Sequence, residues 1–293
     1  MMPAPDHNRL RGELRFNEPL ARHTSWRVGG PARCFYRPAD RDDLVLFLQQ
    51  LDADEPLLWL GLGSNLLVRD GGFKGTVIAT RGRLDRLEWL ADRRLYAEAG
   101  VTCARVARST ARSGLCGVEF LAGIPGTLGG ALAMNAGAFG SETWDRVIQV
   151  ETLDRRGVVR QRPPGDFRMG YRQVQGPSGE WFVAAQLALQ PGDAEAAQRE
   201  IRQLLDKRAA TQPTRQPSCG SVFRNPPGDY AARLIEAAGL KGYRLGGAQV
   251  SAKHANFIIN TGTARAADIE ALIDRVQQRV EAHSGVRLIP EVH

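Results

Sequence analysis

Two glycine-rich stretches constrain this chain more than any other feature of its sequence. The first, GLGSNLLV at residues 61–68, directly follows the apolar run PLLWL, and the second, GIPGTLGGALAMNAGAFG, covers residues 123–140. Glycine lets a backbone approach a ligand closely, and successive N–H groups in such turns form a concave site for anions. Because the first stretch does not read G-x-G-x-x-G followed by a helix, it does not predict a Rossmann unit.

The second stretch has features of a site for a diphosphate and a flat ring. Pro125 sets a turn before a short helix that begins near Thr127, and glycines in and before the first turn remove side-chain bulk. Small residues follow at 135–137, as a flat aromatic ring system requires. The stretch is too rich in glycine and alanine to be a packed core element. Glycine-rich hairpins and tight helix packing are alternatives, but two such loops about 60 residues apart favour a dinucleotide clamp.

Length and composition predict an ordinary soluble protein of two or three domains. The chain has 293 residues, 43% of them hydrophobic. No apolar run approaches the roughly 20 residues that span a bilayer, and the opening MMPAPDHNRLRGELRF lacks the apolar part of a secretory signal. The four cysteines are scattered without a C-x-x-C pair, which argues against a disulfide framework or a zinc site. We therefore expect a cytoplasmic protein that does not insert into membranes.

The charge balance is basic, and it is carried by arginine. The formal net charge is +7, and only four of the 39 cationic residues are lysines. Arginine forks suit phosphate and carboxylate ligands, although codon bias can enrich arginine without any function. The sequence contains no long basic run, no basic patch interleaved with aromatic residues and no nucleic-acid-binding module. These features favour small anionic ligands over nucleic acid.

The hydrophobic periodicity predicts alternating strands and helices, hence an α/β or α+β fold. Strands are expected at 32–38, 75–80, 87–90, 94–100, 146–154 and 181–190, and the stretch 56–68 is expected to form strand, glycine loop, strand. Helices are expected from about Asp40, from Thr102 to Gly114, at 194–209, from Asp229 to Gly239 and at 264–284. The prolines of TQPTRQPSCG, residues 211–220, indicate a domain boundary.

The loop PSCGSVFRNP, residues 217–226, contains two candidate reactive side chains, Cys219 and Ser221. A thiol nucleophile needs a paired base, and among the five histidines only His254 has a suitable context, SAKHANF. No G-x-S-x-G elbow surrounds Ser221, so a serine-hydrolase triad is not predicted. A serine without a base can still donate a proton to a very basic acceptor such as a carbanion.

Seven stretches that occur in one order carry a resemblance to a known family. They are HTSWRVGGPA (23–32), GLGSNLLV, GIPGTLGGALAMNAGAFG, MGYR (169–172), PSCGSVFRNP, AARLIEAAGLKGYRLGGAQVSAKHANFIIN (231–260) and LIPEV (288–292). Together they closely resemble the UDP-N-acetylenolpyruvoylglucosamine reductase (MurB) family of peptidoglycan synthesis, from about residue 20 onward. The uninterrupted run between residues 225 and 260 resembles the shorter, type II form.

The resemblance implies a vanillyl-alcohol-oxidase/PCMH-like FAD-binding fold of two α/β subdomains with a C-terminal α/β substrate-binding domain. FAD-binding subdomain 1 is expected at residues 1–80, joined by the C-terminal tail 286–293, subdomain 2 at 81–210 and the substrate-binding domain at 211–285. The implied activity is that of a UDP-N-acetylmuramate dehydrogenase, with non-covalent FAD, NADPH as electron donor and a UDP-sugar as substrate. Cell-wall biogenesis, cell shape and cell division are the implied processes, and a monomer is expected.

The resemblance also implies roles for individual residues. Arg172 is implied to stabilise the negative charge that develops on the substrate, Glu291 to assist it, and Ser221 to protonate the carbanion, while Cys219 packs the loop. Candidate substrate-binding residues are Tyr171, Asn225 and Lys253. Candidate FAD-binding residues are Gly61, Gly63, Ser64, Asn65, Leu66, Gly123, Ile124, Pro125, Gly126, Thr127, Gly129, Gly130, Asn135, Ala136 and Gly137.

The sequence departs from the family pattern at two places, and two alternative functions stay open. Family members usually continue PEVR, where this chain has His293, and they carry a serine two residues after the arginine, where this chain has Val174. One alternative is another FAD oxidoreductase of the same fold that acts on a sugar or hydroxy acid. The other is a non-catalytic nucleotide-binding module, which would show neither flavin colour nor NADPH turnover.

Overall fold

The computed structural model describes residues 9–293, and their contacts divide the chain into two compact units. The first unit contains the described residues up to Phe16, then Cys34–Leu62 and Gly75–Leu205. The second contains Asn17–Arg33, Gly63–Lys74 and Asp206–His293. The predicted three-part division of the chain stays a prediction.

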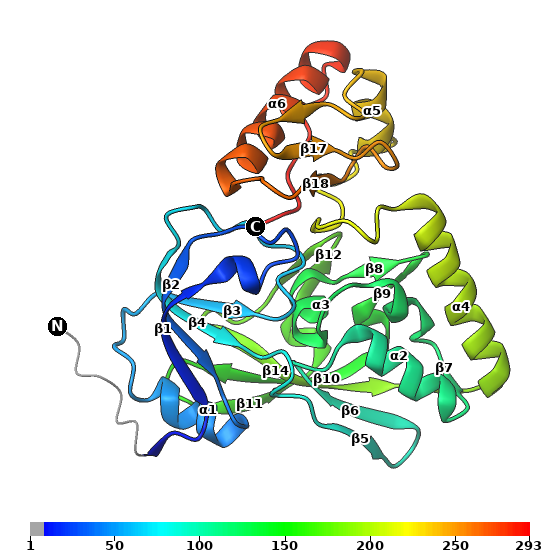
Figure 1. Ribbon diagram of the computed structural model, residues 1–293. Helices are drawn as coiled ribbons and strands as arrows, with labels where there is room; N and C mark the ends of the chain where they lie inside the picture. Colours follow the sequence, from blue (N-terminus) through cyan, green and yellow to red (C-terminus); the bar gives the residue numbers. More distant parts are fainter. Residues whose placement is uncertain (1–8) are drawn as a thin grey trace. The chain divides into compact units, whose positions relative to one another are not determined.

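Two sheets form the frame of the first unit (Figure 1). One has the strand order β1-β2-β4-β3, formed by Glu13–Pro19, Pro31–Arg37, Phe73–Ala79 and Leu57–Leu60, and the chain crosses between the units within the first three of these strands. The other is antiparallel in the order β11-β10-β14-β6-β5, formed by Val159–Arg162, Val147–Asp154, Glu180–Ala188, Arg94–Glu98 and Leu87–Leu90. The predicted strands at 32–38, 75–80, 87–90, 94–100, 146–154 and 181–190 are therefore confirmed.

Helices and short hairpins complete the first unit. The helices are α1 (Arg41–Leu48), α2 (Cys103–Arg112), α3 (Leu128–Met134) and α4 (Ala194–Thr211), whose last turn enters the second unit. Two hairpins pair β8 (Gly137–Ala138) with β9 (Ser141–Glu142) and β12 (Arg168–Gly170) with β13 (Gln173–Gln175), and β7 (Leu115–Cys116) pairs antiparallel with the distant β15 (Gln190–Pro191). Asp40 and Thr102 cap α1 and α2, because their side chains accept the backbone N–H groups of Asp43 and Arg105.

The five-stranded sheet packs against two buried clusters, and an irregularity in β14 separates neighbouring residues that belong to different clusters. Val183 of β14 belongs to the cluster that contains Phe47 of α1. Ala185, two residues further on, belongs to the cluster that contains Val106 of α2 and Leu132 of α3. Regular alternation would place it on the same face as Val183, and the register shift between the pairs Glu151–Ala184 and Thr152–Phe182 accounts for the difference. Figure 1 shows α2 and α3 over the same side of this sheet.

The second unit is a small α/β arrangement around one helix. Its sheet has the order β16-β17-β18, formed by Arg244–Leu245, Ala248–Val250 and Ile258–Asn260, and its helices are α5 (Ala231–Ala237) and α6 (Ala266–Ser284). The predicted apolar stripe of α6 is buried throughout: Ile269, Leu272, Ile273, Val276 and Val280. Gly285 ends α6 with a φ of 71°, a left-handed conformation that glycine adopts without strain.

Two expectations about the glycine-rich stretches were wrong. The second stretch does contribute to the core, because α3 buries Leu128, Ala131 and Leu132 in the cluster with α2. Its glycines and alanines have little or no side chain, so the helix can pack closely against its neighbours. This is the tight helix packing that was the alternative to a ligand site. No strand follows the glycine turn at residues 64–68, and this segment instead makes two backbone hydrogen bonds to His293, far away in sequence. In residues 9–293, no helix combines the length and the apolar character needed to cross a membrane.

Candidate functional site

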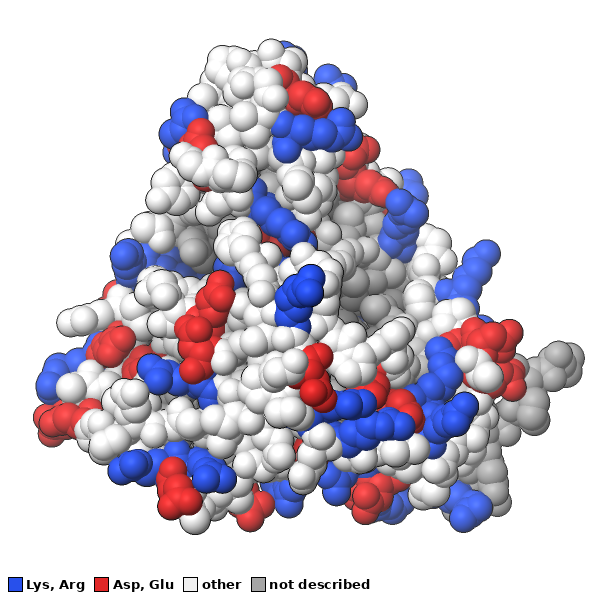
Figure 2. Space-filling model, turned by 180° about the vertical axis from the view of Figure 1, so that it is seen from behind, with Lys and Arg blue, Asp and Glu red and all other residues white. Residues whose placement is uncertain are grey.

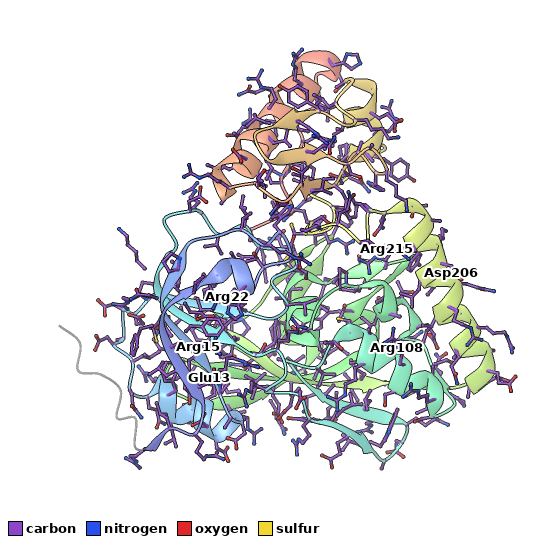
Figure 3. The ribbon with its side chains drawn as sticks, in the orientation of Figure 1. Glu13, Arg15, Arg22, Arg108, Asp206 and Arg215 are labelled. Carbon is purple, nitrogen blue, oxygen red and sulfur yellow. The ribbon has the colours of Figure 1, made fainter. Side chains whose placement is uncertain are left out.

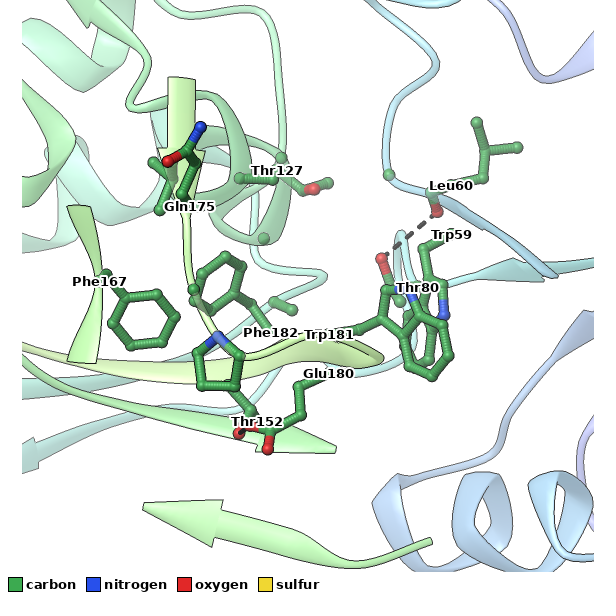
Figure 4. A pocket seen from close by; sticks show the side chains of 18 of the residues that line it. Trp59, Leu60, Thr80, Thr127, Thr152, Phe167, Gln175, Glu180, Trp181 and Phe182 are labelled. Atoms are coloured by element: carbon green, nitrogen blue, oxygen red, sulfur yellow. Dashed lines mark hydrogen bonds between the residues drawn. The ribbon is translucent and has the colours of Figure 1, made fainter. Parts of the chain in front are cut away.

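A cavity of about 520 Å³ lies within the first unit (Figure 4). Residues of β3, β10, α3, β13 and β14, the segment between β13 and β14 and Thr80 directly after β4 are among those that line it. Its volume falls in the range of small-molecule sites, and most of its lining is apolar with a few polar groups. The cavity therefore has the size and the surface of a ligand site.

Aromatic side chains form two parts of the cavity lining. The rings of Trp59 and Trp181 are stacked with centroids 5.2 Å apart. Phe167 and Phe182 lie on the other side in Figure 4, with centroids 5.4 Å apart. Flat apolar faces of this kind bind the faces of aromatic ligands such as a nucleobase.

One anionic side chain lines the cavity from below in Figure 4. The Glu180 carboxylate accepts hydrogen bonds from Thr152 Oγ1 at 2.6 Å and from Arg162 Nη2 at 2.7 Å. The bond from Arg162 is the main reason that the pKa of Glu180 lies below its ordinary value. Glu180 is therefore ionised at neutral pH, and its charge is compensated before any ligand binds.

The glycines beside the cavity differ in whether packing excludes a side chain at their position. A Cβ at residue 61 would overlap Thr127 Oγ1, and one at residue 129 would lie 2.8 Å from the Ala99 Cβ. Gly61 and Gly129 are therefore required by packing. A Cβ at residue 130 would meet nothing nearer than 3.8 Å, so Gly130 leaves open space at the cavity. This open cradle fits a bulky ligand that lies against α3.

The N-terminus of α3 differs from the expected phosphate site. The helix has only seven residues, and its first two N–H groups are already paired. Leu128 N donates to Val101 O at 2.8 Å, and Gly129 N donates to Ala99 O at 2.9 Å. Binding of a diphosphate near residues 126–130 stays a prediction, but these two N–H groups serve the fold.

Arg172 lies in the two-residue turn between β12 and β13, with a φ of 55°. This left-handed conformation is uncommon for a residue with a side chain and persists only where the surroundings impose it. Its Nη2 donates to Gly137 O at 2.9 Å, and the Nδ2 of Asn135 donates to Gly170 O at 3.4 Å. The structure thus brings the predicted Arg172 together with the predicted flavin-contacting residues 135–137.

Gly137 permits this approach, because a Cβ there would lie 3.3 Å from Arg172 Nη1 and nearer still to Ser141 O. Tyr171, the other turn residue, is 48% exposed, and its ring centroid lies 5.3 Å from Arg172 Cζ. The hairpin tip therefore presents a cationic and an aromatic side chain side by side.

In the second unit, the loop of residues 217–226 pairs with the C-terminal segment. Glu291 N donates to Val222 O at 2.7 Å, and Asn65 Nδ2 donates to Glu291 O at 3.1 Å. Ser221 and Glu291, two of the predicted catalytic residues, therefore lie on neighbouring backbone segments. Arg172, the third predicted catalytic residue, belongs to the first unit.

Cys219 has the environment of a core residue. Its side chain is 3% exposed and packs in the buried cluster of the second unit. Burial, together with the nearby Glu291 charge, raises the pKa of the Cys219 thiol well above its ordinary value. A thiol in this environment stays protonated and is a poor nucleophile.

From Gly63 onward, the first glycine loop belongs to the second unit and is fixed there by backbone contacts. Gly63 adopts a φ of 64°, and its O accepts Ser25 N at 2.9 Å. His293 N donates to Asn65 O at 3.2 Å, and Leu67 N donates to His293 O at 2.7 Å. His293 thus pairs through its backbone with Leu67 and with the predicted FAD-binding residue Asn65.

Two predicted substrate-binding side chains are engaged in the fold. Asn225 Oδ1 accepts Ala231 N at 3.1 Å at the start of α5. Lys253 Nζ donates to Ala209 O in the last turn of α4, where a cation also complements the helix dipole. Both contacts hold the side chains inside the second unit, and their roles toward a substrate stay predictions.

Sequence reasoning did not predict the aromatic, acidic and threonine side chains that line the cavity: Trp59, Thr80, Thr152, Phe167, Glu180, Trp181 and Phe182. The only signal was a tryptophan in each of two predicted strands. Trp59 and Trp181 come from different sheets, so their stacking depends on tertiary structure.

Much of the arginine excess is used in ion pairs. Glu13 of β1 accepts hydrogen bonds from Arg15 and, at 3.1 Å, from Arg37 (Figure 3 labels Glu13 and Arg15). The bond from Arg15 is the main cause that lowers the pKa of Glu13. On the face in Figure 2, cationic and anionic side chains are interspersed. Within the described part of the chain, no three His, Cys, Asp or Glu side chains gather as metal ligands would.

Comparison with known proteins adds the identity of the two regions. Residues 32–161 match the family model of an FAD binding domain, and residues 212–293 match that of the UDP-N-acetylenolpyruvoylglucosamine reductase C-terminal domain. The reductase of Alkalilimnicola ehrlichii is 66% identical over 96% of this chain and 94% of its own length. That of Methylococcus capsulatus is 64% identical over 96% and 93%. A crystal structure of the reductase (MurB) from Thermus caldophilus is similar with a TM-score of 0.83 and 34% identity, over 97% of this chain and 98% of that one.

The FAD-binding region and its fold define the class: the protein is an FAD-dependent oxidoreductase, and the predicted PCMH-like fold is confirmed. The similarity along nearly the whole chain then identifies the family. The chain belongs to the UDP-N-acetylenolpyruvoylglucosamine reductase family, which functions in the synthesis of peptidoglycan precursors.

Proposed function

We propose that this protein reduces UDP-N-acetylenolpyruvoylglucosamine to UDP-N-acetylmuramate, with NADPH as the electron donor. The observation that carries the proposal is the 66% identity, over 96% of the chain, with a reductase named for this substrate. Relatives this similar over their full length share the residues that contact substrate more often than they share surface residues. The alternative sugar or hydroxy-acid oxidoreductase has no such support.

The cavity of the first unit fits a part of FAD. Its stacked tryptophans offer a surface for a purine, and the Glu180 carboxylate has acceptor capacity left for a ribose hydroxyl, because a carboxylate has about four lone-pair sites. Gly130 lines the same cavity and leaves open space there. FAD is held without a covalent bond in this proposal.

FAD held in the first unit would supply the hydride chemistry for the enolpyruvyl double bond, with NADPH as the source of electrons. The protein has to manage the negative charge that develops on the adjacent carbon and its carboxylate. The Arg172 guanidinium, oriented by Gly137 O, binds this carboxylate with a planar fork. Ser221 Oγ then donates a proton to the adjacent carbon, and the Glu291 carboxyl assists the charge stabilisation. One hydride and one proton together complete the reduction of the double bond.

An anaerobic two-step experiment tests this function. NADPH should bleach the flavin, and the enolpyruvyl substrate should then restore its colour with one turnover of UDP-N-acetylmuramate. Reoxidation by simple sugars or hydroxy acids, but not by the enolpyruvyl substrate, would contradict the proposal.

The variant Arg172→Lys makes the test specific. Lysine keeps the charge but loses the planar fork and the bond geometry to Gly137 O, so reoxidation by substrate should slow more than bleaching by NADPH. Equal slowing of both steps would remove Arg172 from the substrate reaction.

A further inference from the structure

The backbone of residues 222–224, which directly follows Ser221, is held on one side by a single buried asparagine. Phe223 N donates to Asn256 Oδ1 at 2.9 Å, and Asn256 Nδ2 donates to Phe223 O at 2.8 Å. Val222 N also donates to the backbone O of Asn256 at 2.8 Å. Asn256 is only 3% exposed, so water does not compete for these bonds.

The same three residues are held on the other side by the C-terminal segment. Glu291 N donates to Val222 O at 2.7 Å, Arg224 N donates to Ile289 O at 2.9 Å, and Phe223 and Pro290 are bridge partners. Residues 222–224 therefore form a short middle strand. One neighbour is the segment that carries Glu291, and the other is replaced by the amide of Asn256.

Asn256 itself is fixed by its own turn. Asn256 N donates to His254 Nδ1 at 3.3 Å, and Phe257 N donates to His254 O at 3.0 Å. The His254 ring packs edge-on against Phe257, and burial lowers the pKa of His254, which keeps Nδ1 free to accept. The Asn256 amide thus acts from a rigid turn.

We propose that Asn256 is a positioning residue for the reaction. It holds the strand 222–224, and through that strand it sets the place of Ser221 Oγ relative to the Glu291 segment. The inference rests on the roles proposed above for Ser221 and Glu291. An asparagine amide is suited to this task because it offers one donor and one acceptor side by side, which match the N–H and C=O of a single residue.

The first test is Asn256→Ala in the FAD-loaded protein. Loss of both side-chain bonds leaves the buried Phe223 N–H and C=O unpaired, and the strand shifts to recover partners. A displacement of this kind should slow flavin reoxidation by the enolpyruvyl substrate about 10- to 100-fold, with bleaching by NADPH changed less than about twofold.

Asn260→Ala is the matched control. Asn260 is also buried, and its side chain bonds to the backbone of the same unit, with Nδ2 at 2.9 Å from Trp26 O and Oδ1 at 2.8 Å from Gly262 N. Its side chain bonds to Trp26, Gly262 and Ala264 rather than to residues 222–224. Its loss should lower the melting temperature comparably while leaving the ratio of the two half-reaction rates unchanged.

The pH dependence of the reoxidation rate in Asn256→Asp distinguishes a positioning role from a purely structural one. An ionised aspartate accepts from Phe223 N but repels Phe223 O, whereas a protonated one donates to Phe223 O and reproduces the amide. Burial raises the pKa of such a carboxyl above the ordinary value of about 3.9. The reoxidation rate, taken relative to the parent protein at each pH, should therefore recover as the pH is lowered.

The outcomes separate clearly. The proposal is supported if Asn256→Ala slows flavin reoxidation selectively and Asn256→Asp regains this rate at low pH. If the alanine variant does not fold, the pH dependence of the aspartate variant is the test. Parallel loss of both half-reactions, or an aspartate variant without pH-dependent recovery, overturns it. A parent protein that NADPH bleaches and the enolpyruvyl substrate does not reoxidise would instead refute the proposed function.

Discussion

Cys219 and Ser221 stand two residues apart in one loop, yet their surroundings differ. Cys219 is buried in the core of the second unit, and burial raises the pKa of its thiol. Ser221 is only partly buried and lies next to the strand that pairs with the Glu291 segment. A hydroxyl in the second environment is accessible to a substrate, whereas the thiol is not. The local environments therefore favour Ser221 as the proton donor.

Three variants test this difference. Ser221→Ala should still be bleached by NADPH, but reoxidation by substrate should slow by about 10² to 10⁴, the usual effect of losing a positioned proton donor. Ser221→Cys should recover part of that rate, because a thiol can donate from nearly the same place. Cys219→Ala should leave both steps close to those of the parent. Stopped-flow flavin absorbance measures each step, and an inactive Cys219→Ala beside an active Ser221→Ala would reverse the assignment.

Acid sensitivity at α5 has a local cause. The hydrogen bond from Arg233 lowers the pKa of Asp229 to about 2. Because this pKa is lower in the folded state than in the unfolded state, the pair contributes stability above the unfolded value, near 3.8, and this is lost as the pH falls toward 2. The stability difference between the parent and Asp229→Asn should therefore shrink from pH 6 to about pH 2. Urea unfolding at low salt measures it, and a constant difference would contradict the assignment.

At the scale of elements, two neighbouring glycines of α3 have different surroundings. Gly129 is needed for close packing, whereas Gly130 leaves room for a ligand. Gly129→Ala should destabilise the protein, because its Cβ would lie 2.8 Å from the Ala99 Cβ. Gly130→Ala has open space and should raise stability by about 0.5–1 kcal/mol in the FAD-free protein, since alanine is a better helix residue. It should nevertheless weaken FAD binding if FAD lies against this helix. Thermal melts with and without FAD measure both the stability and the FAD affinity of each variant. Unchanged FAD affinity in Gly130→Ala would mean that FAD does not lie against α3.

The elements that sequence reasoning predicts well are those with a local cause. The apolar stripe of α6 and the Thr102 cap of α2 depend only on nearby residues, and both are confirmed. The burial of α3 and the absence of a strand after Gly63 depend on what packs against them from distant parts of the chain. The same holds for the site: glycine spacing indicated the loops around the cavity, whereas the Trp59–Trp181 stack arises from two different sheets.

At the scale of the whole molecule, the second unit is assembled from three separated segments of the chain. Trp26 comes from the first of them and is fully buried, and its Nε1 donates to Ile258 O at 2.7 Å. Asp70 comes from the second, and its carboxylate accepts Ala266 N at 3.0 Å and Ala267 N at 3.2 Å. Asp70 thus caps the N-terminus of α6 from almost two hundred residues away in sequence. The C-terminal region is therefore incomplete without the two N-terminal segments.

A fragment of residues 206–293 tests this dependence. Alone, it lacks Trp26 from its core and the Asp70 cap of α6, so we expect helix content without the near-ultraviolet signal of fixed packing and without a cooperative urea transition. In the full chain, Trp26→Ala should cost about 3–5 kcal/mol, the usual effect of removing a buried large aromatic side chain. Asp70→Asn retains one acceptor at the helix terminus and should cost less than Asp70→Ala, which removes both. Circular dichroism of the fragment and urea titration of the full-length variants measure these effects. A fragment that unfolds cooperatively by itself, with a Trp26→Ala chain as stable as its parent, would show that residues 206–293 form an independent domain.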